Sequence, residues 1–195
     1  MDINNIFSSF LAVDTLSTID NLELKRYAKD LKTQENGVTK SNFLGWQSDT
    51  LTVPNAQIDL LVKEILARAE DLKSIIGFKK EYNFYLSNLW INISQTSAFN
   101  RPHIHSDSIL SGVYYVDCNA NSGSIVFLHP SVAQKILIDE SILDCFTKFS
   151  ASTNFITPET AKLVLFPSWL EHYVEPNLSI AERISIAFNI SIRKE

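Results

Sequence analysis

The chain has 195 residues, of which 45% are hydrophobic and 20% are charged. These proportions exclude a disordered or fibrous chain and are typical of a globular protein that is long enough to bury its own core. The net charge of −5 and the lack of a basic run argue against nucleic acid as a partner, because phosphate binding requires a cationic surface.

The sequence carries few signals of targeting or of disulfide bonding. Two cysteines, Cys118 and Cys145, provide neither a disulfide framework nor a paired-cysteine zinc motif. The first residues lack the basic start and the long apolar core of a signal peptide, and no apolar run reaches the roughly 18–20 residues of a membrane helix. We therefore expect one soluble, cytoplasmic domain over residues 1–195, without membrane contact.

The first part of the chain predicts a strand, a helix and a loop. An apolar stretch at 6–13 favours a short strand, and the spacing over 18–32 is typical of a helix that buries Leu22, Leu24, Tyr27, Ala28 and Leu31. Residues 34–50 are polar and loop-like but contain Phe43 and Trp46. We expect this segment to be a flap, which either covers a pocket or packs on the outside of the core.

The clearest helix follows Pro54 and Asn55 and ends at Gly77. Its apolar residues recur at spacings of three and four, which places them on one face: Ile58, Leu61, Val62, Ile65, Leu66, Ala69 and Leu72. A helix with one apolar face needs a sheet or another helix to cover that face.

Beyond about residue 81 the sequence favours short strands that are rich in aromatic and β-branched residues: 83–94, 109–116, 124–128, 161–166 and 180–192. Most of these strands follow one another without a helix between them, which is typical of an antiparallel sandwich or barrel. The predicted fold is mainly β, with helical support at about 1–80 and a barrel-like core at about 81–195. Exposed strand edges would allow a homodimer.

The last predicted strand, RISIAFNISI, alternates strictly between two kinds of residue. Its even-numbered residues are apolar, whereas its odd-numbered residues are small or polar: Arg183, Ser185, Ala187, Asn189 and Ser191. Successive side chains of a strand point to opposite faces, so one face of this strand is wholly apolar. The other face suits either a solvated surface or a cavity with room for a ligand.

The chain has four histidines, and one residue separates His103 from His105. In an extended chain both imidazoles leave the same face, where they can bind one metal ion at about 2.0–2.1 Å. His172 is the candidate third ligand, because a barrel brings distant strands side by side. The alternative is that the pair consists of two incidental polar residues at a strand end. His129 precedes Pro130 and is expected to be a turn or surface residue.

Arg183 lies eleven residues after His172 (183 − 172 = 11), on the polar face of the last strand. A buried arginine requires an anion, and its guanidinium fork binds a carboxylate through two parallel hydrogen bonds. Ser185 would add a hydroxyl donor beside it. Arg183 is therefore either a clamp for the carboxylate of a ligand or the partner of an acidic side chain such as Glu171 or Glu182.

Four segments together resemble a known family: the His-x-His pair, LSGVYYV, LVLFPSWLEHYVEPN and RISIAFN. The combination is similar to the 2-oxoglutarate and Fe(II)-dependent oxygenases, and most similar to a small subgroup related to prolyl hydroxylases. The resemblance spans roughly 83–192, and SNFLGWQS at 41–48 is similar to an N-terminal element of that subgroup. It implies a double-stranded β-helix, or jelly roll, and an enzyme that hydroxylates a substrate while 2-oxoglutarate and oxygen give succinate and carbon dioxide.

By this resemblance, the iron would be bound by His103, His105 and His172. The common family pattern is His-x-Asp/Glu, whereas a middle histidine leaves Fe(II) with three neutral ligands and its full +2 charge. A second frame uses His105 and Asp107 as ligands, with His103 beside them. We favour the first frame, because the longer turn before LSGVYYV suits a barrel better.

The resemblance also implies a site for the cosubstrate. Arg183 would hold the distal carboxylate of 2-oxoglutarate, with assistance from Ser185 and from Tyr115, which matches the family's tyrosine better than Tyr114. Asn92 and Asn189 would line the pocket.

Other functions stay open at this stage. A cupin shares the jelly roll and the His-x-His pair without using 2-oxoglutarate, but it usually adds a glutamate that 106–115 lacks, and it gives Arg183 no role. A binding module without catalytic activity is the third class. The substrate is a peptide residue, a free amino acid or a small metabolite.

Overall fold

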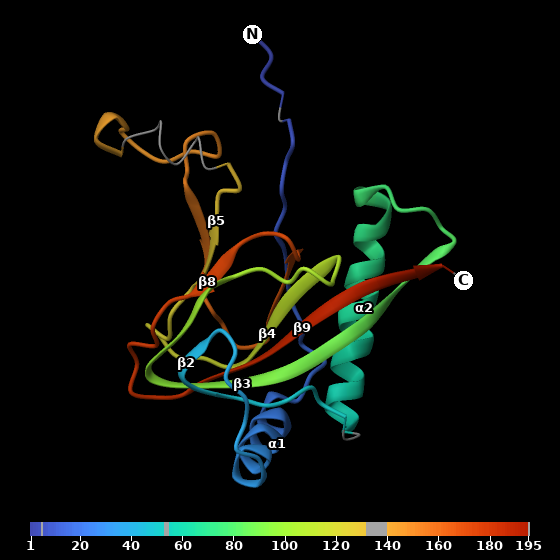
Figure 1. The fold of residues 1–195 in the computed structure, drawn as a ribbon, viewed down its shortest axis with the longest axis vertical. Coiled ribbons are helices and arrows are strands. Elements are labelled where there is room, and N and C mark those ends of the chain that lie inside the picture. The colour runs from blue at the N-terminus through green and yellow to red at the C-terminus, as the bar shows by residue number, and fades with distance from the viewer. Residues whose placement is uncertain (5, 53–54, 132–139, 195) are drawn as a thin grey trace.

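The computed structural model describes residues 1–4, 6–52, 55–131 and 140–194 (Figure 1). Its strands are β1 (Ala12–Thr15), β2 (Asn42–Gln47), β3 (Tyr82–His103), β4 (Leu110–Asp117), β5 (Ile125–Leu128), β6 (Thr153–Ile156), β7 (Lys162–Pro167), β8 (His172–Val174) and β9 (Arg183–Lys194). They form one curled antiparallel sheet in the order β1–β7–β4–β9–β3–β8–β5–β6, and β2 pairs with β3 outside this path.

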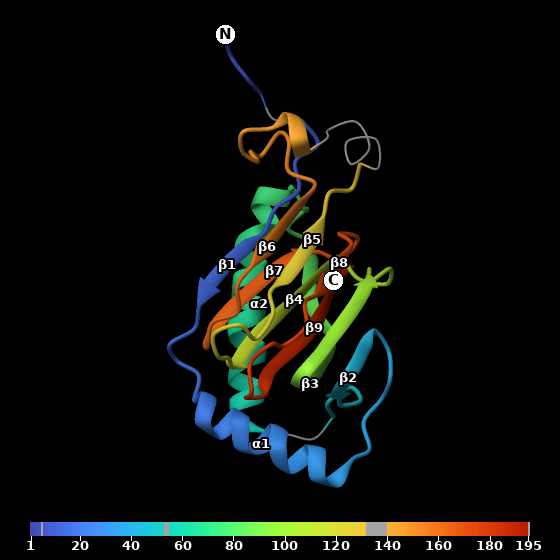
Figure 2. The same cartoon turned by 90° about the vertical axis from the view of Figure 1, so that its left-hand side faces the viewer.

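The long strand β3 connects the two layers into which this sheet curls. Its residues 82–94 pair with β9, whereas Asn100 and His103 pair with β8. Between these two stretches Ser97 has a positive φ of 69°, which bends the strand. Figure 2 shows the larger layer, with β1, β7, β4, β9 and β3 side by side. The smaller layer, made of β8, β5 and β6, faces it across a pocket.

The larger layer has an apolar core on each face. On one face Ile184, Ile186 and Phe188 of β9 are buried against the helices. On the other face Tyr115 of β4 and Phe166 of β7 are buried with residues of β5 in a second apolar cluster. The inner face of this layer is therefore partly core and partly the wall of the pocket.

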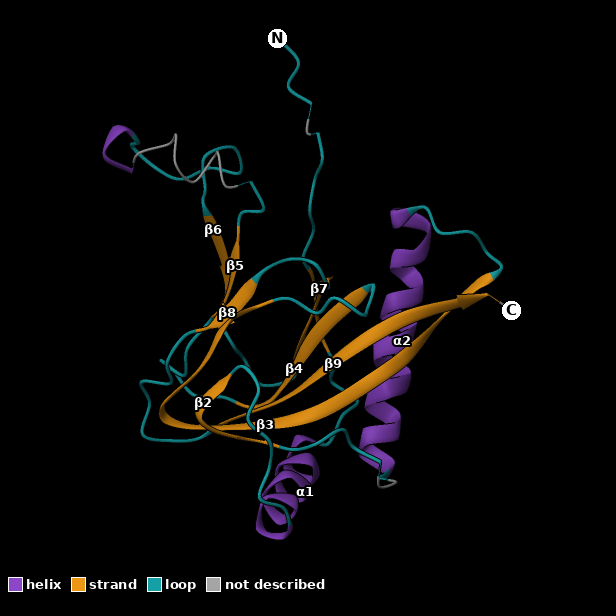
Figure 3. Cartoon of the chain, viewed as in Figure 1, coloured by secondary structure: helices purple, strands orange, loops and turns teal. Residues whose placement is uncertain are grey.

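Two helices, α1 (Asn21–Gln34) and α2 (Ala56–Ile76), cover the outer face of the larger layer (Figure 3). The side chains of Asp20 and Asn55 cap them by accepting hydrogen bonds from the first free N–H groups, and Gly77 ends α2 with a φ of 89°. Helix α2 buries Ile58, Leu61, Ile65 and Ala69, and each larger aliphatic side chain contributes about 1.5–3 kcal/mol by leaving water. No described helix is both long and apolar enough to cross a membrane.

The predicted fold class, mainly β with N-terminal helices, is confirmed, but three local predictions were wrong. The first strand is Ala12–Thr15 and not 6–13, because residues 12–15 are the ones that pair with β7. Leu22 is 73% exposed, since it lies in the first turn of α1 and faces away from the sheet. Residues 42–47 of the predicted loop form β2, which pairs with β3. Pro54, the predicted start of α2, lies outside the described residues.

Candidate metal centre and anion pocket

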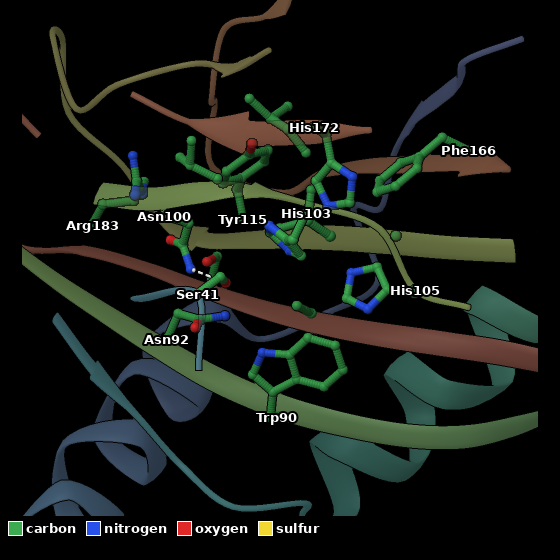
Figure 4. A pocket seen from close by; sticks show the side chains of 16 residues that line it. Ser41, Trp90, Asn92, Asn100, His103, His105, Tyr115, Phe166, His172 and Arg183 are labelled. Carbon is green, nitrogen blue, oxygen red and sulfur yellow. Dashed lines mark hydrogen bonds between the residues drawn. The ribbon is translucent and has the colours of Figure 1, made fainter. Parts of the chain in front are cut away.

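A pocket lies between the two layers of the curled sheet, with histidines at one end and an arginine at the other (Figure 4). Six of the seven residues predicted for the site line it: His103, His105, Tyr115, His172, Arg183 and Ser185. They come from β3, the loop after it, β4, β8 and β9. Only the curling of the sheet brings these segments together.

The three histidines form a compact cluster at one end of the pocket. One ring nitrogen from each of His103, His105 and His172 lies within 4.8 Å of the others. His103 and His172 are direct partners in the β3–β8 ladder, with ring centroids 4.4 Å apart. Two ligands of one ion, each at about 2.1 Å from it, lie at most about 4.2 Å apart, so small ring rotations bring all three nitrogens onto one metal.

Hydrogen bonds to the backbone fix which nitrogen of two histidines is free. The Nδ1 atom of His103 lies 2.7 Å from the carbonyl oxygen of Arg101, and Nδ1 of His172 lies 2.9 Å from that of Leu170. A carbonyl oxygen only accepts, so each Nδ1 carries the hydrogen and each Nε2 keeps a lone pair. This is the arrangement by which proteins orient a histidine for metal binding.

Burial keeps these imidazoles neutral. It lowers the pKa of His172 to about 3, with a further contribution from the charge of His103. It also lowers the pKa of His105 to about 4, and the pKa of His103 falls for the same reason. Neutral imidazole is the form that binds a metal ion, so protons compete little for this cluster near pH 7.

The alternative pair of ligands, His105 with Asp107, is not brought together in the way that the three histidines are. Asp107 is exposed in the turn after His105 and does not belong to the histidine cluster. His105 is held toward the cluster by its backbone N–H, which donates to the carbonyl of Ser168 at 3.0 Å. The structure thus brings together His103, His105 and His172, and their role as ligands stays a prediction.

Arg183 provides a buried positive charge at the other end of the pocket. The residue is 2% exposed, and no carboxylate among the described residues pairs with it; Glu182 instead contacts Lys29 and Lys32. Burial lowers the pKa of the guanidinium, because the charged form loses hydration. An interior cation without an acidic partner is costly, which points to an anion supplied from outside the chain.

The turn between β4 and β5 anchors this arginine without neutralising it. Nη1 of Arg183 donates to the carbonyls of Ser122 and Gly123, and Nη2 of Arg183 donates to Oγ of Ser94 at 3.2 Å. Gly123 has a φ of 85°, and a Cβ there would lie 2.9 Å from Nη1, so a larger residue would crowd the guanidinium. Three of the five N–H groups are used within the described residues, which leaves two for a ligand.

Two hydroxyl groups accompany Arg183. The hydroxyl of Tyr115 is buried and has no hydrogen-bond partner among the described residues, and Ser185 is 6% exposed in the pocket wall. Tyr114 points to the opposite face, where its hydroxyl donates to Asn21 at 2.9 Å. A buried hydroxyl without a partner is unusual and indicates a missing acceptor. Of the two tyrosines, the structure therefore places Tyr115 at the anion end.

Some pocket residues were missed by sequence reasoning. Trp90 lies 5.9 Å from the ring of His105, and Phe166 packs edge-on against His172 at 4.7 Å. Trp90 is two residues before Asn92 on β3, and both line the pocket. The alternation of β3 could have identified Trp90, whereas the position of Phe166 depends on the curling of the sheet. His129 directly follows β5, is half-buried and lies outside the histidine cluster.

The residues present fit a divalent metal and a dicarboxylate in one pocket. Imidazole nitrogens suit iron as well as zinc, copper or nickel, and three of them leave coordination positions open for other ligands. The two unused N–H groups of Arg183 and the hydroxyl of Tyr115 fit one carboxylate. The described residues that line the pocket include no aspartate, glutamate or lysine. The charges that an anion would meet there are therefore those of the metal and of Arg183.

Solved structures with the same fold share little sequence with this chain. A prolyl-4-hydroxylase from Pseudomonas putida is 13% identical with a TM-score of 0.61, over 95% of this chain and 92% of that chain. The non-haem α-ketoglutarate-dependent epimerase SnoN from nogalamycin biosynthesis is 13% identical with a TM-score of 0.69, over 95% and 78%. HygX from Streptomyces hygroscopicus, solved with nickel and 2-oxoglutarate, is 10% identical with a TM-score of 0.64, over 94% and 83%. These likenesses confirm the predicted jelly roll.

The family itself is identified by sequence. No curated protein matches the chain, but a family profile described as "Putative 2OG-Fe(II) oxygenase" matches residues 88–189, just over half of the 195 residues. That range contains the histidine cluster, Tyr115 and both Arg183 and Ser185. The chain therefore belongs to the 2-oxoglutarate and Fe(II)-dependent oxygenases, enzymes whose cofactors are Fe(II) and 2-oxoglutarate.

Proposed function

We propose that this protein hydroxylates a carbon atom in an uncharged part of a small molecule or peptide, with the iron bound by His103, His105 and His172. The observation that supports this most is the presence, in one pocket, of a neutral three-histidine cluster and a buried Arg183 that no described carboxylate neutralises. When bound, iron and 2-oxoglutarate supply the oxidation, in which 2-oxoglutarate and oxygen give succinate, carbon dioxide and one oxygen atom for the substrate.

Arg183 would bind the distal carboxylate of 2-oxoglutarate. Its two unused N–H groups and the hydroxyl of Tyr115 are donors, and a carboxylate accepts several hydrogen bonds at once. Ser185 stands in the same wall of the pocket and would add a third donor group. This assignment explains why the fold tolerates a buried cation with no carboxylate partner, and a buried hydroxyl with no acceptor, among the described residues.

The three neutral histidines would leave the metal with its full charge. A site with an aspartate as second ligand would offset one unit of that charge. Here the metal and Arg183 would both attract the dianionic cosubstrate, so we expect 2-oxoglutarate to bind tightly and mainly through electrostatic attraction.

The rest of the pocket favours a substrate whose reacting part is uncharged. The rings of Trp90 and Phe166 flank the histidine end, and Asn92 and Asn100 supply amide groups farther along. Since no described lining residue is acidic, a cationic group would find no partner. A peptide residue, as in the prolyl hydroxylases of similar fold, and a small molecule, as in SnoN, both meet this condition.

A cupin activity that does not use 2-oxoglutarate is not supported. It would leave Arg183 and the hydroxyl of Tyr115 without a function, and the chain matches an oxygenase family. For cell location and assembly we propose a cytoplasmic protein that does not bind nucleic acid and forms a homodimer through β1 or β6, the outer strands of the sheet order. Light scattering of the purified protein tests the dimer directly.

Visible spectroscopy without oxygen tests the proposed activity. Purified protein with Fe(II) and 2-oxoglutarate should develop a weak visible absorption band that neither component gives alone. On admission of oxygen, 2-oxoglutarate should be consumed, and fractions of a cell extract that contain the substrate should accelerate its consumption. A protein that shows no band and binds no 2-oxoglutarate at saturating Fe(II) would refute the oxygenase proposal.

A further inference from the structure

Among the three clustered histidines, His105 lacks the carbonyl contact that orients the other two. His103 and His172 each donate Nδ1–H to a backbone oxygen two residues earlier. His105 lies in the loop after β3, and the group that faces its Nδ1 is the side-chain amide of Asn189, at 3.5 Å. Hydrogen bonds at such sites are often long before the ligand binds.

Asn189 is held by two buried serines. It is the register partner of Ser111 in the β4–β9 ladder, and Oγ of Ser111 lies 2.6 Å from its amide oxygen. Oγ of Ser111 also lies 2.9 Å from Oγ of Ser168. Asn189, Ser111 and Ser168 are 6%, 1% and 0% exposed, so the network is closed to solvent. The carbonyl of Ser168 also holds the backbone N–H of His105, so one residue restrains both parts of the histidine.

The direction of this network determines which nitrogen of His105 is free. If the amide nitrogen of Asn189 faces His105, it donates to Nδ1, and the neutral ring must then carry its hydrogen on Nε2. If the amide is rotated by 180°, its oxygen accepts from Nδ1–H and Nε2 keeps a lone pair for the metal. The amide nitrogen then donates a hydrogen bond to Oγ of Ser111, and the hydroxyl of Ser111 donates to Oγ of Ser168. The two amide orientations differ only by exchange of O and N, and the serine hydroxyls can serve either one.

We propose that Asn189 is a positioning residue for the metal, which accepts a hydrogen bond from Nδ1–H of His105 and is locked in that orientation by Ser111 and Ser168. The inference rests on the proposed three-histidine metal centre. In that centre all three histidines are oriented in the same way. Each donates its Nδ1–H to an oxygen of the protein, and its Nε2 is left free to bind the metal. For His103 and His172 the backbone provides the oxygen, and for His105 a neighbouring strand provides it.

The test compares metal binding by four proteins: the unaltered chain, Asn189→Ala, Asn189→Asp and Asn42→Ala. Co(II) affinity is measured by competition with a coloured chelator, without 2-oxoglutarate. Asn189→Ala should weaken binding by about 10- to 100-fold, the usual effect of losing such a partner. Asn189→Asp keeps an oxygen acceptor and should bind within about threefold of the unaltered protein or more tightly. Asn42 is a buried asparagine of β2, outside the pocket, so Asn42→Ala controls for general loss of stability.

Proton NMR of the Co(II)-loaded proteins supplies a readout that stability alone does not change. The unaltered protein and Asn189→Asp should show three strongly shifted, exchangeable Nδ1–H signals, and Asn189→Ala should lose one of them to rapid exchange with water. An Asn189→Ala protein that keeps its affinity and all three signals would overturn the inference, as would an Asn189→Asp protein as weak as Asn189→Ala. An unaltered protein that binds no Co(II) would refute the metal centre itself, and the inference with it.

Discussion

The two ends of the pocket handle charge in opposite ways. At the histidine end, burial keeps three imidazoles neutral, and hydrogen bonds to backbone carbonyls orient the Nδ1–H groups of His103 and His172 before any ligand binds. At the arginine end, the charge is permanent, and carbonyls and a hydroxyl anchor it, but no carboxylate among the described residues neutralises it. One end thus lacks a cation and the other lacks an anion. A metal ion and a dicarboxylate satisfy both ends at once.

The largest effect should follow from removing the charge at the arginine end. Arg183→Met should weaken 2-oxoglutarate binding by roughly 150- to 5000-fold, since breaking a buried ion pair costs about 3–5 kcal/mol. Co(II) affinity measured without 2-oxoglutarate should change little, because the histidine end is untouched. Isothermal titration of both ligands measures the two effects.

A surface arginine provides the control for this variant. Arg68 of α2 pairs with Asp14 and Glu64 outside the pocket, so Arg68→Met should leave both affinities unchanged. If Arg183→Met still binds 2-oxoglutarate within about tenfold of the unaltered protein, the carboxylate is held elsewhere.

A pair of adjacent tyrosines separates ligand binding from stability at the same end. Tyr115→Phe removes a buried hydroxyl that has no partner among the residues that the structure describes, so it should weaken 2-oxoglutarate binding by about tenfold or more while leaving the free energy of unfolding unchanged or raised. Tyr114→Phe removes the hydrogen bond to Asn21 and should lower the free energy of unfolding by about 1 kcal/mol without affecting 2-oxoglutarate. Ligand titration and urea unfolding of both variants decide the matter. If Tyr114→Phe weakened 2-oxoglutarate binding and Tyr115→Phe did not, Tyr115 would not be the tyrosine that binds the carboxylate.

A further effect concerns acid, to which the histidine end should respond and the arginine end should not. In the folded, metal-free protein the pKa of His172 is about 3, whereas in the unfolded chain it is about 6.5. Between these values the unfolded chain binds more protons, so the free energy of unfolding should fall as the pH falls, by up to about 1.4 kcal/mol per pH unit. Urea unfolding in the presence of a chelator at pH 7.0 and 5.5 measures this slope.

Replacing histidines one at a time sharpens this result. His172→Asn should flatten the dependence on pH, whereas His129→Asn, at the end of β5 and outside the cluster, should not. An unchanged slope in His172→Asn would mean that burial of this imidazole does not govern acid stability.

Much of the fold and of the site was predictable from local patterns. The alternation of 183–192 predicted one apolar face and one polar face that was either solvated or part of a cavity wall, and Arg183, Ser185 and Ala187 of that polar face line the pocket. The one-sided spacing of 58–72 identified α2, because burial of an apolar face decides where a helix packs. These predictions succeeded because each depends on residues close together in the sequence.

The remainder depends on contacts between distant segments. Strand β8 has three residues, too few for a periodic pattern, and it is a strand because it pairs with β3 on one side and with β5 on the other. Strand β2 looked like a loop because its pairing partner lies about fifty residues away on β3. The proximity of Asn189 to Ser111 and His105 follows from the register of β9 against β4, which no local pattern fixes.

The most direct test of the account is the iron content of two variants that differ by two positions in the sequence. His105→Ala removes a member of the histidine cluster, whereas Asp107→Ala alters an exposed turn outside it. Both proteins, loaded anaerobically with Fe(II) and freed of unbound metal, are assayed for bound iron. The account predicts that Asp107→Ala retains about one iron per chain and that His105→Ala loses most of it. Iron retained by His105→Ala and lost by Asp107→Ala would contradict the three-histidine metal centre.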